Sequence, residues 1–199
     1  MVVFIDCNPS FSIYTQMSLV SSDRLIIPMM ADFSSIEGIK GIMTLLYDEY
    51  PTAALKKYAE NIMTFTKQIE RFKDLKLPLI DTFVFNNYTC GSNGIAKAYN
   101  SLKSELVKFC IDQYDKFPQY FVRKKISRNQ KWEDLYIADV RDFHSVGRVS
   151  SSLGIPIIEL DKQSTYEMPD GEKVPIQKNG YNNSVDALNN LVDIISANN

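Results

Sequence analysis

The sequence has very few of the residues that build metal sites and disulfide frameworks. Among 199 residues it contains one histidine, His144, and three cysteines, Cys7, Cys90 and Cys110. The cysteines are odd in number, lie far apart and form no C-x-x-C pair, which argues against a disulfide scaffold or a zinc site. The single histidine cannot build a metal cluster by itself.

Long hydrophobic runs and a dominant charge are missing too. No apolar run reaches the ~18 residues that a membrane-spanning helix needs, and no charged segment followed by an apolar stretch opens the chain. The formal net charge is only −2, so any contact with nucleic acid must come from a local patch. We therefore expect a cytoplasmic protein without a membrane partner.

What is present is a regular alternation of apolar strands and amphipathic helices. A chain of 199 residues with 45% hydrophobic residues is long enough for one domain with its own core. Alternating strands and helices predict a parallel sheet with helices on both faces. The expected fold is a single α/β domain over residues 1–199.

The boundaries of these elements follow from periodicity, caps and turn residues. Ser34 and Glu37 have the S-x-x-E spacing of a capping box, so a helix should begin there and continue through Leu46. Residues 86–94 have the composition of a loop, and 168–171 that of a hairpin turn. The strands are predicted at 2–6, 24–29, 79–85, 121–126 and 155–160, and the other helices at 12–21, 52–75, 95–114, 145–153 and 185–196.

An aspartate ends the first apolar run. Val2, Val3, Phe4 and Ile5 precede Asp6, and the run predicts a buried strand that delivers one carboxylate at its end. A carboxylate in that place needs a cation or backbone donors. The alternative is that Asp6 caps the following turn through its own backbone.

The order of short motifs in residues 2–41 resembles the Walker B region of the ParA/MinD class of deviant-Walker ATPases, and the ParA branch in particular. The motifs are Asp6 followed by Pro9-Ser10, an Ile27-Pro28 strand, and a helix that starts with Phe33-Ser34. The resemblance implies a P-loop NTPase-like fold. The P-loop of this family normally lies upstream of the Walker B strand, so we expect the chain to correspond to the C-terminal portion of a family member, lacking the N-terminal P-loop half.

The resemblance also implies nucleotide-binding residues. Asp6 would act on Mg²⁺, and Pro9 and Ser10 would lie in the switch loop that senses the γ-phosphate. Asn86 would contact the adenine edge, although an asparagine at a strand end also commonly turns the chain. The loop containing Asp142 and Phe143 would flank the adenine pocket.

Two other motifs are rejected. The glycine-rich segment at 91–97 lacks the G-x-x-x-x-G-K-[ST] spacing of a P-loop. Asp142, His144 and Ser145 are adjacent in one loop, which does not create the relay of a hydrolase, and no G-x-S-x-G motif exists.

A basic run without acidic residues lies between Phe121 and Lys131. In ParA relatives this region contains basic residues that touch DNA without reading its sequence. Arginine and lysine suit that role because they neutralise phosphates and release counterions, although an ordinary solvated surface is the alternative. The residues are Arg123, Lys124, Lys125, Arg128 and Lys131.

For the complete protein, the resemblance implies a partition ATPase in plasmid or chromosome segregation. It would bind ATP and Mg²⁺, form a homodimer, bind DNA non-specifically at the nucleoid and respond to a centromere-binding, ParB-type partner. We expect this chain alone neither to bind ATP tightly nor to hydrolyse it, because it has no P-loop lysine.

The alternative function is an interaction or dimerisation module without ATPase activity. A strand at 2–6 without neighbouring strands would leave apolar faces and backbone edges open. We therefore expect self-association that covers this segment.

Overall fold

The computed structural model describes residues 2–7, 13–50, 52–61, 64–71, 76–88, 90–91, 94–95 and 97–196. The chain divides into two compact units. The first comprises Met1–Ile27, Asp32–Asp81 and Ser104–Arg123, and the second Pro28–Ala31, Thr82–Lys103 and Lys124–Asn199. The single-domain prediction stays a prediction, and each unit is described by itself.

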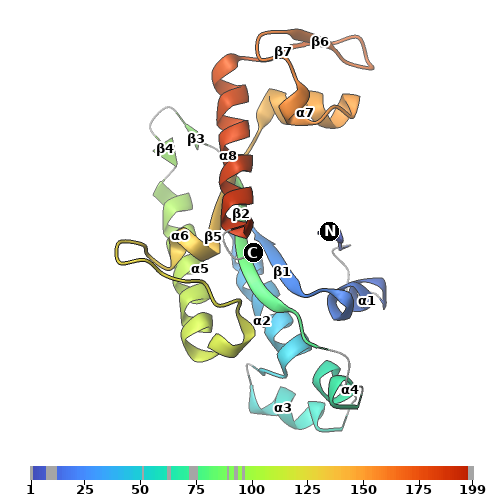
Figure 1. Ribbon diagram of the computed structural model, residues 1–199, viewed down its shortest axis with the longest axis vertical. Helices are drawn as coiled ribbons and strands as arrows, with labels where there is room; N and C mark the ends of the chain where they lie inside the picture. The colour runs from blue at the N-terminus through green and yellow to red at the C-terminus, as the bar shows by residue number, and fades with distance from the viewer. Residues whose placement is uncertain are drawn as a thin grey trace. The chain divides into compact units, whose positions relative to one another are not determined.

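The first unit is mainly helical around the starts of two strands (Figure 1). Its buried side chains include Leu25 of β1, Ile39 and Leu46 of α2, Ile80 of β2 and Leu106 of α5. Its elements are α1 (Ile13–Ser21), most of β1 (Arg24–Met29), α2 (Phe33–Tyr47), α3 (Ala53–Ala59), α4 (Phe65–Arg71), the start of β2 (Leu79–Tyr88), most of α5 (Lys97–Lys116) and the 3₁₀ helix η1 (Pro118–Tyr120). The unit boundary crosses β1 after Ile27.

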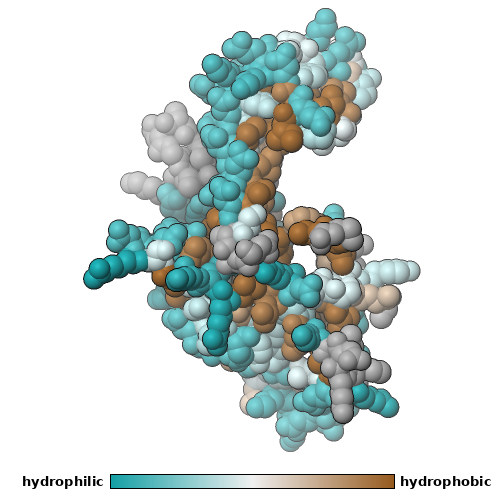
Figure 2. Space-filling model, in the orientation of Figure 1, coloured by the Kyte–Doolittle hydropathy of each residue, from teal (hydrophilic) through white to brown (hydrophobic). Residues whose placement is uncertain are grey.

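The second unit holds the rest of β2 and the C-terminal elements. Helix α8 packs along β5, and the side of α8 turned to the viewer in Figure 2 is hydrophilic, as expected for an amphipathic helix on a sheet. The elements are β3 (Cys90–Gly91), β4 (Gly94–Ile95), α6 (Glu133–Tyr136), β5 (Ile137–Arg141), α7 (His144–Leu153), η2 (Ile157–Glu159), β6 (Thr165–Glu167), β7 (Lys173–Pro175) and α8 (Lys178–Ser196).

The three main strands form one parallel sheet in the order β1-β2-β5. Strand β5 runs parallel to β2, with Phe83 opposite Ile137 and Asn86 opposite Val140, and the register shifts between Asn86 and Tyr88. The parallel sheet with flanking helices confirms the predicted α/β fold class. In this register the carboxyl ends of β2 and β5 meet at one sheet edge, where ligands of α/β proteins commonly bind.

The first predicted strand is wrong. Residues 2–7 have no strand structure, and Val2, Val3 and Phe4 are each at least 67% exposed. An apolar segment becomes a buried strand only when other strands pair with it, and this segment lies outside the sheet order β1-β2-β5. The exposure agrees with the expectation that an unpaired segment here would keep its apolar faces open.

The start of α2 differs from the predicted capping box. The N-cap is Asp32, whose side chain accepts a hydrogen bond from the backbone N–H of Ser35, and Glu37 instead pairs with Lys40 at 2.6 Å. The hydrogen bonds from Ser34 and Ser35 lower the pKa of the Asp32 carboxyl. An aspartate is at least as good an N-cap as a serine, so the N-cap lies two residues earlier than predicted.

Four other predicted elements need correction. In place of the long helix predicted over 52–75, the structure has two helices, α3 and α4. The side chain of Thr64 accepts a hydrogen bond from the N–H of Lys67 and so caps the start of α4. The segment 121–126 makes only an isolated bridge, Ile80 with Phe121. The 155–160 segment contains η2 instead of a strand, and α8 begins at Lys178, six residues before the predicted cap Ser184.

In the described part of the chain, none of the helices has both the length and the apolar content that crossing a bilayer requires.

Candidate functional site

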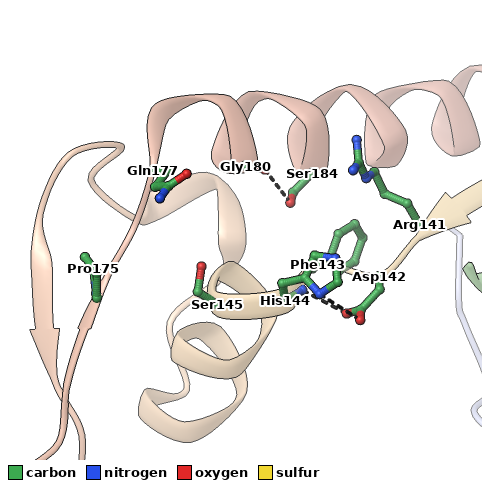
Figure 3. A pocket seen from close by; sticks show the side chains of 9 residues that line it. All are labelled: Arg141, Asp142, Phe143, His144, Ser145, Pro175, Gln177, Gly180 and Ser184. Atoms are coloured by element: carbon green, nitrogen blue, oxygen red, sulfur yellow. Dashed lines mark hydrogen bonds and ion pairs between the residues drawn. The ribbon is translucent and has the colours of Figure 1, made fainter. Parts of the chain in front are cut away.

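A pocket of about 360 Å³ lies in the second unit where β5 ends and α7 begins. Figure 3 shows the β5–α7 turn on one side of the pocket and α8 along the other, with β7 contributing Pro175. The lining residues are Arg141, Asp142, Phe143, His144, Ser145, Pro175, Gln177, Gly180 and Ser184. The pocket therefore occupies the position outside a strand's carboxyl end that the fold class favours for ligands.

The turn is held by one hydrogen bond and one ion-pair contact between Asp142 and His144. The backbone N–H of His144 donates to Oδ1 of Asp142 at 2.8 Å, and Nδ1 of His144 lies 2.9 Å from Oδ2 of the same carboxylate. His144 has a positive φ of 46°, a conformation that few residues other than glycine adopt. The carboxylate of Asp142 thus fixes both the backbone and the ring of His144.

The backbone of Phe143 is held by hydrogen bonds from the first turn of α7. Its carbonyl accepts from the N–H groups of Val146 and Gly147, which closes the first turn of the helix. A Cβ at Gly147 would lie 3.0 Å from the Cβ of Phe143, a tight contact, so a larger residue at this position would require Phe143 to shift. Phe143 remains half-buried and presents an aromatic surface to the pocket.

Helix α8 supplies the opposite wall. Ser184 is 2% exposed, and its hydroxyl donates to the carbonyl of Gly180 at 2.8 Å, so its lone pairs remain available as acceptors. The helix is supported from beneath by an apolar core that joins it to α7 and β7, comprising Val146, Val149, Leu160, Met168, Val174, Ile176 and Tyr181.

The pocket combines an aromatic surface, a cation and several hydrogen-bonding groups. Phe143 offers stacking, Arg141 offers donors, and His144 and Ser184 offer ring-nitrogen and hydroxyl groups. A few polar groups on an otherwise apolar concave surface are what small-molecule sites use to fix orientation. A flat, heteroaromatic ring is the kind of ligand that this set can stack against and hydrogen-bond.

The structure brings together two of the three residues assigned to adenine. Asp142 and Phe143 line the pocket, whereas Asn86 does not. Asn86 is exposed near the end of β2 and is paired in register with Val140, two residues before Asp142. Asn86 therefore lies at the same sheet edge as the pocket without forming its wall.

The residues assigned to magnesium and to the switch loop are less well placed. Asp6 is exposed and lies outside the sheet, and Pro9 and Ser10 fall outside the described residues. In the part of the chain that the structure describes, no group of three or more histidine, cysteine, aspartate or glutamate residues could hold a metal ion. Mg²⁺ is usually bound through one or two carboxylates together with substrate phosphates, so Asp6 fits as one ligand at most.

The basic run divides into exposed and buried members. Arg123, Lys125, Arg128 and Lys131 are exposed, but Lys124 is only 7% exposed. The Lys124 ammonium donates to the carbonyl of Leu135 at 2.8 Å and to the hydroxyl of Thr82 at 3.2 Å. Lys124 therefore cannot offer its charge to DNA, which corrects its assignment. Arg123 belongs to the first unit, so the exposed members of the run in the second unit are Lys125, Arg128 and Lys131.

No sequence motif indicates the wall that α8 and β7 provide. Pro175, Gln177, Gly180 and Ser184 lie more than 30 residues after the β5–α7 turn and belong to no motif. His144 appeared only as part of a rejected triad. A polar residue such as Ser184 on the apolar side of an amphipathic helix is the one feature that could have drawn attention.

Comparison with known proteins gives a class for the N-terminal part. Residues 2–57 match the family model described as an AAA domain, which indicates a P-loop NTPase-like, nucleotide-binding module. A search of curated proteins and a search of solved structures found no match. The match does not extend to the pocket, so the role of the pocket is argued from its geometry.

Proposed function

We propose that this chain is the base-binding portion of a ParA-type partition ATPase that acts in DNA segregation. The observation that carries the proposal is the pocket at the end of β5, which is lined by Asp142 and Phe143, the two loop residues that the ParA resemblance assigns to adenine. The AAA-domain match over residues 2–57 supports the same class.

In this proposal Phe143 stacks on the base, and Asp142 fixes the turn. Asn86 approaches the ligand from the neighbouring strand end. In the complete protein Asp6 acts on Mg²⁺ and Pro9 and Ser10 sense the γ-phosphate of ATP. The complete protein is a homodimer that binds DNA non-specifically, works with a centromere-binding, ParB-type partner and is located at the nucleoid in the cytoplasm.

Adenosine monophosphate tests the base site without requiring a phosphate loop. We expect weak, millimolar binding that shifts the amide resonances of residues 142–147 and 180–184 in a ¹H–¹⁵N NMR titration. Base–aromatic stacking contributes roughly 1–3 kcal/mol, so Phe143→Ala should weaken binding by about 5- to 150-fold. Phe33→Ala is the matched control, because Phe33 is 65% exposed on the other unit. Unchanged affinity in Phe143→Ala, or shifts confined to other residues, would contradict the base site.

The proposed DNA-binding role predicts that this chain binds duplex DNA weakly and that the binding weakens as the salt concentration rises. Lys125, Arg128 and Lys131 are exposed, so changing all three to glutamate should leave the fold intact and remove binding that otherwise lies at roughly 10⁻⁴–10⁻⁶ M. Fluorescence anisotropy with a labelled duplex at several salt concentrations measures this. The control changes Lys56, Lys57 and Lys173, also exposed, to glutamate with the same total charge change. Equal loss in both triple variants would show a net-charge effect instead of a binding surface.

A second candidate, an interaction module without ATPase activity, is favoured by one observation. Val2, Val3, Phe4 and Ile5 form an exposed apolar segment, and such segments often mark interaction sites. The two functions differ in the nucleotide titration, since an interaction module has no reason to bind adenosine monophosphate in the β5–α7 pocket.

A further inference from the structure

Arg141 lines the pocket as a half-buried cation at the carboxyl end of β5. Figure 3 shows its side chain extending from the end of the strand toward α8. A guanidinium that is partly withdrawn from water loses hydration, so an arginine in such a place is usually paired with a carboxylate. Arg24 of the first unit shows the usual arrangement, since its guanidinium lies 3.0 Å from the carboxylate of Asp81.

The two carboxylates nearest to Arg141 in the sequence are engaged by other residues. Asp139 lies two residues earlier on the same strand and therefore on the same face of the sheet, but it pairs with the ammonium of Lys103 at 2.6 Å. Both carboxylate oxygens of Asp142 are in contact with His144. Among the residues that the structure describes, no carboxylate is paired with Arg141.

A cation in this position is suited to an anionic ligand group. A guanidinium presents a rigid, planar fork of N–H donors, which matches two oxygens of a carboxylate or a phosphate. The other polar side chains of the lining, apart from Asp142 and His144, are the neutral Ser145, Gln177 and Ser184. The positive charge of Arg141 is therefore available to a ligand in the pocket.

We propose that Arg141 forms an oxyanion subsite in this pocket, so that the pocket prefers ligands with a carboxylate or phosphate group to neutral ligands of similar shape. The inference goes beyond the base site, because it requires an anionic group and no base. Only where the anionic ligand is a nucleotide does it rest on the proposed function.

Two pairs of ligands test the subsite, because the members of each pair share a ring and differ in charge. Adenosine monophosphate and adenosine test for phosphate, and benzoate and benzamide test for carboxylate. In NMR titrations of the 199-residue chain, we expect the anionic member to bind at least about 10-fold more tightly in one or both pairs. The preference should decrease as salt rises. A preference in one pair alone identifies which oxyanion the subsite takes.

Substitutions of Arg141 assign the preference to its side chain. Arg141→Gln should bring the affinity ratio within each pair close to one. Arg141→Lys keeps the charge but loses the planar fork, so its ratio should lie between those of the parent and Arg141→Gln. Lys173→Gln is the matched control, because it removes one positive charge from an exposed side chain of the same unit outside the pocket, and it should keep the ratio of the parent.

The outcomes separate the subsite from the proposed function. Equal affinities within both pairs, or a ratio in Arg141→Gln equal to that of the parent, overturn the subsite, while binding of adenosine in the pocket would leave the base site standing. A preference for benzoate over benzamide without any adenosine-induced shift at the β5–α7 turn supports the subsite and contradicts the base site. Failure of all four ligands to perturb the pocket overturns both.

Discussion

Replacing Lys124 with glutamate is expected to unfold the second unit. The ammonium is buried, donates to the carbonyl of Leu135 and the hydroxyl of Thr82, and lies 4.8 Å from the centre of the Tyr136 ring. A carboxylate in its place would face a carbonyl oxygen and a ring face, both of which repel a negative charge. An uncompensated buried charge costs about 3–5 kcal/mol, a large part of the total stability of a small domain.

The single tryptophan gives a direct readout of this change. Trp132 stacks on Tyr136 with ring centroids 4.8 Å apart, so its fluorescence reports on the region around Lys124. We expect the urea midpoint followed by Trp132 to fall sharply or the native signal to be absent in Lys124→Glu. Lys125→Glu, the exposed neighbour, should change stability by no more than about 0.5 kcal/mol. Equal midpoints for the two variants would show that Lys124 is solvated.

Replacing Arg24 with methionine should destabilise the first unit by about 3 kcal/mol, near the lower end of the range for breaking a buried ion pair. Asp81 is fully buried, and its carboxylate lies 3.0 Å from the guanidinium of Arg24, which is itself partly exposed. The substitution removes the ion pair that Arg24 makes with this buried carboxylate. Urea denaturation followed by far-UV circular dichroism measures the loss.

A double variant separates the ion pair from other effects of Arg24. Asp81→Asn in the Arg24→Met background should recover part of the stability, because a neutral amide is less costly to bury than a carboxylate. Lys40→Met is the control for a surface pair, since Lys40 bonds an exposed Glu37 and such pairs contribute about 0–1 kcal/mol. Similar losses in Arg24→Met and Lys40→Met would place the Arg24–Asp81 pair among the weak surface bridges.

The parts of the fold that local patterns determine were predictable. The strand at β1, the core of β2, the α7 helix ended by Gly154 and the hairpin of β6 and β7 all follow from apolar runs and turn residues. Gly154 ends α7 with a φ of 66°, the left-handed conformation that favours glycine. The alternation of these elements was enough to predict the α/β class.

The errors lie where distant residues decide the outcome. No strand was predicted at β5, where Asp139 and Arg141 interrupt the apolar pattern. In the structure Lys103, 36 residues away, pairs with Asp139 at 2.6 Å. The basic run at 123–125 looks uniformly solvated in sequence, and only the contacts with Thr82 and Leu135 bury Lys124. No local pattern contains either partner.

The candidate site shows the same division. Asp142 and Phe143 could be assigned from the resemblance of their loop, because a turn after a strand is a local feature. Ser184 and Gly180 join them through the packing of α8 along β5, which the sequence did not reveal because the helix was expected to begin only at Ser184. The glycine and asparagines at its start have low helix propensity, and packing against the strand overrides it.

The most direct measurement of the central claim is the position of the adenine ring in the bound state. Intermolecular nuclear Overhauser effects in the complex with adenosine monophosphate report which side chains lie beside the H2 and H8 protons of the base. The base site at the end of β5 predicts contacts from these protons to the ring of Phe143 and the β protons of Ser184. Contacts only to residues outside the pocket, with resonances of the β5–α7 turn unchanged, would contradict it.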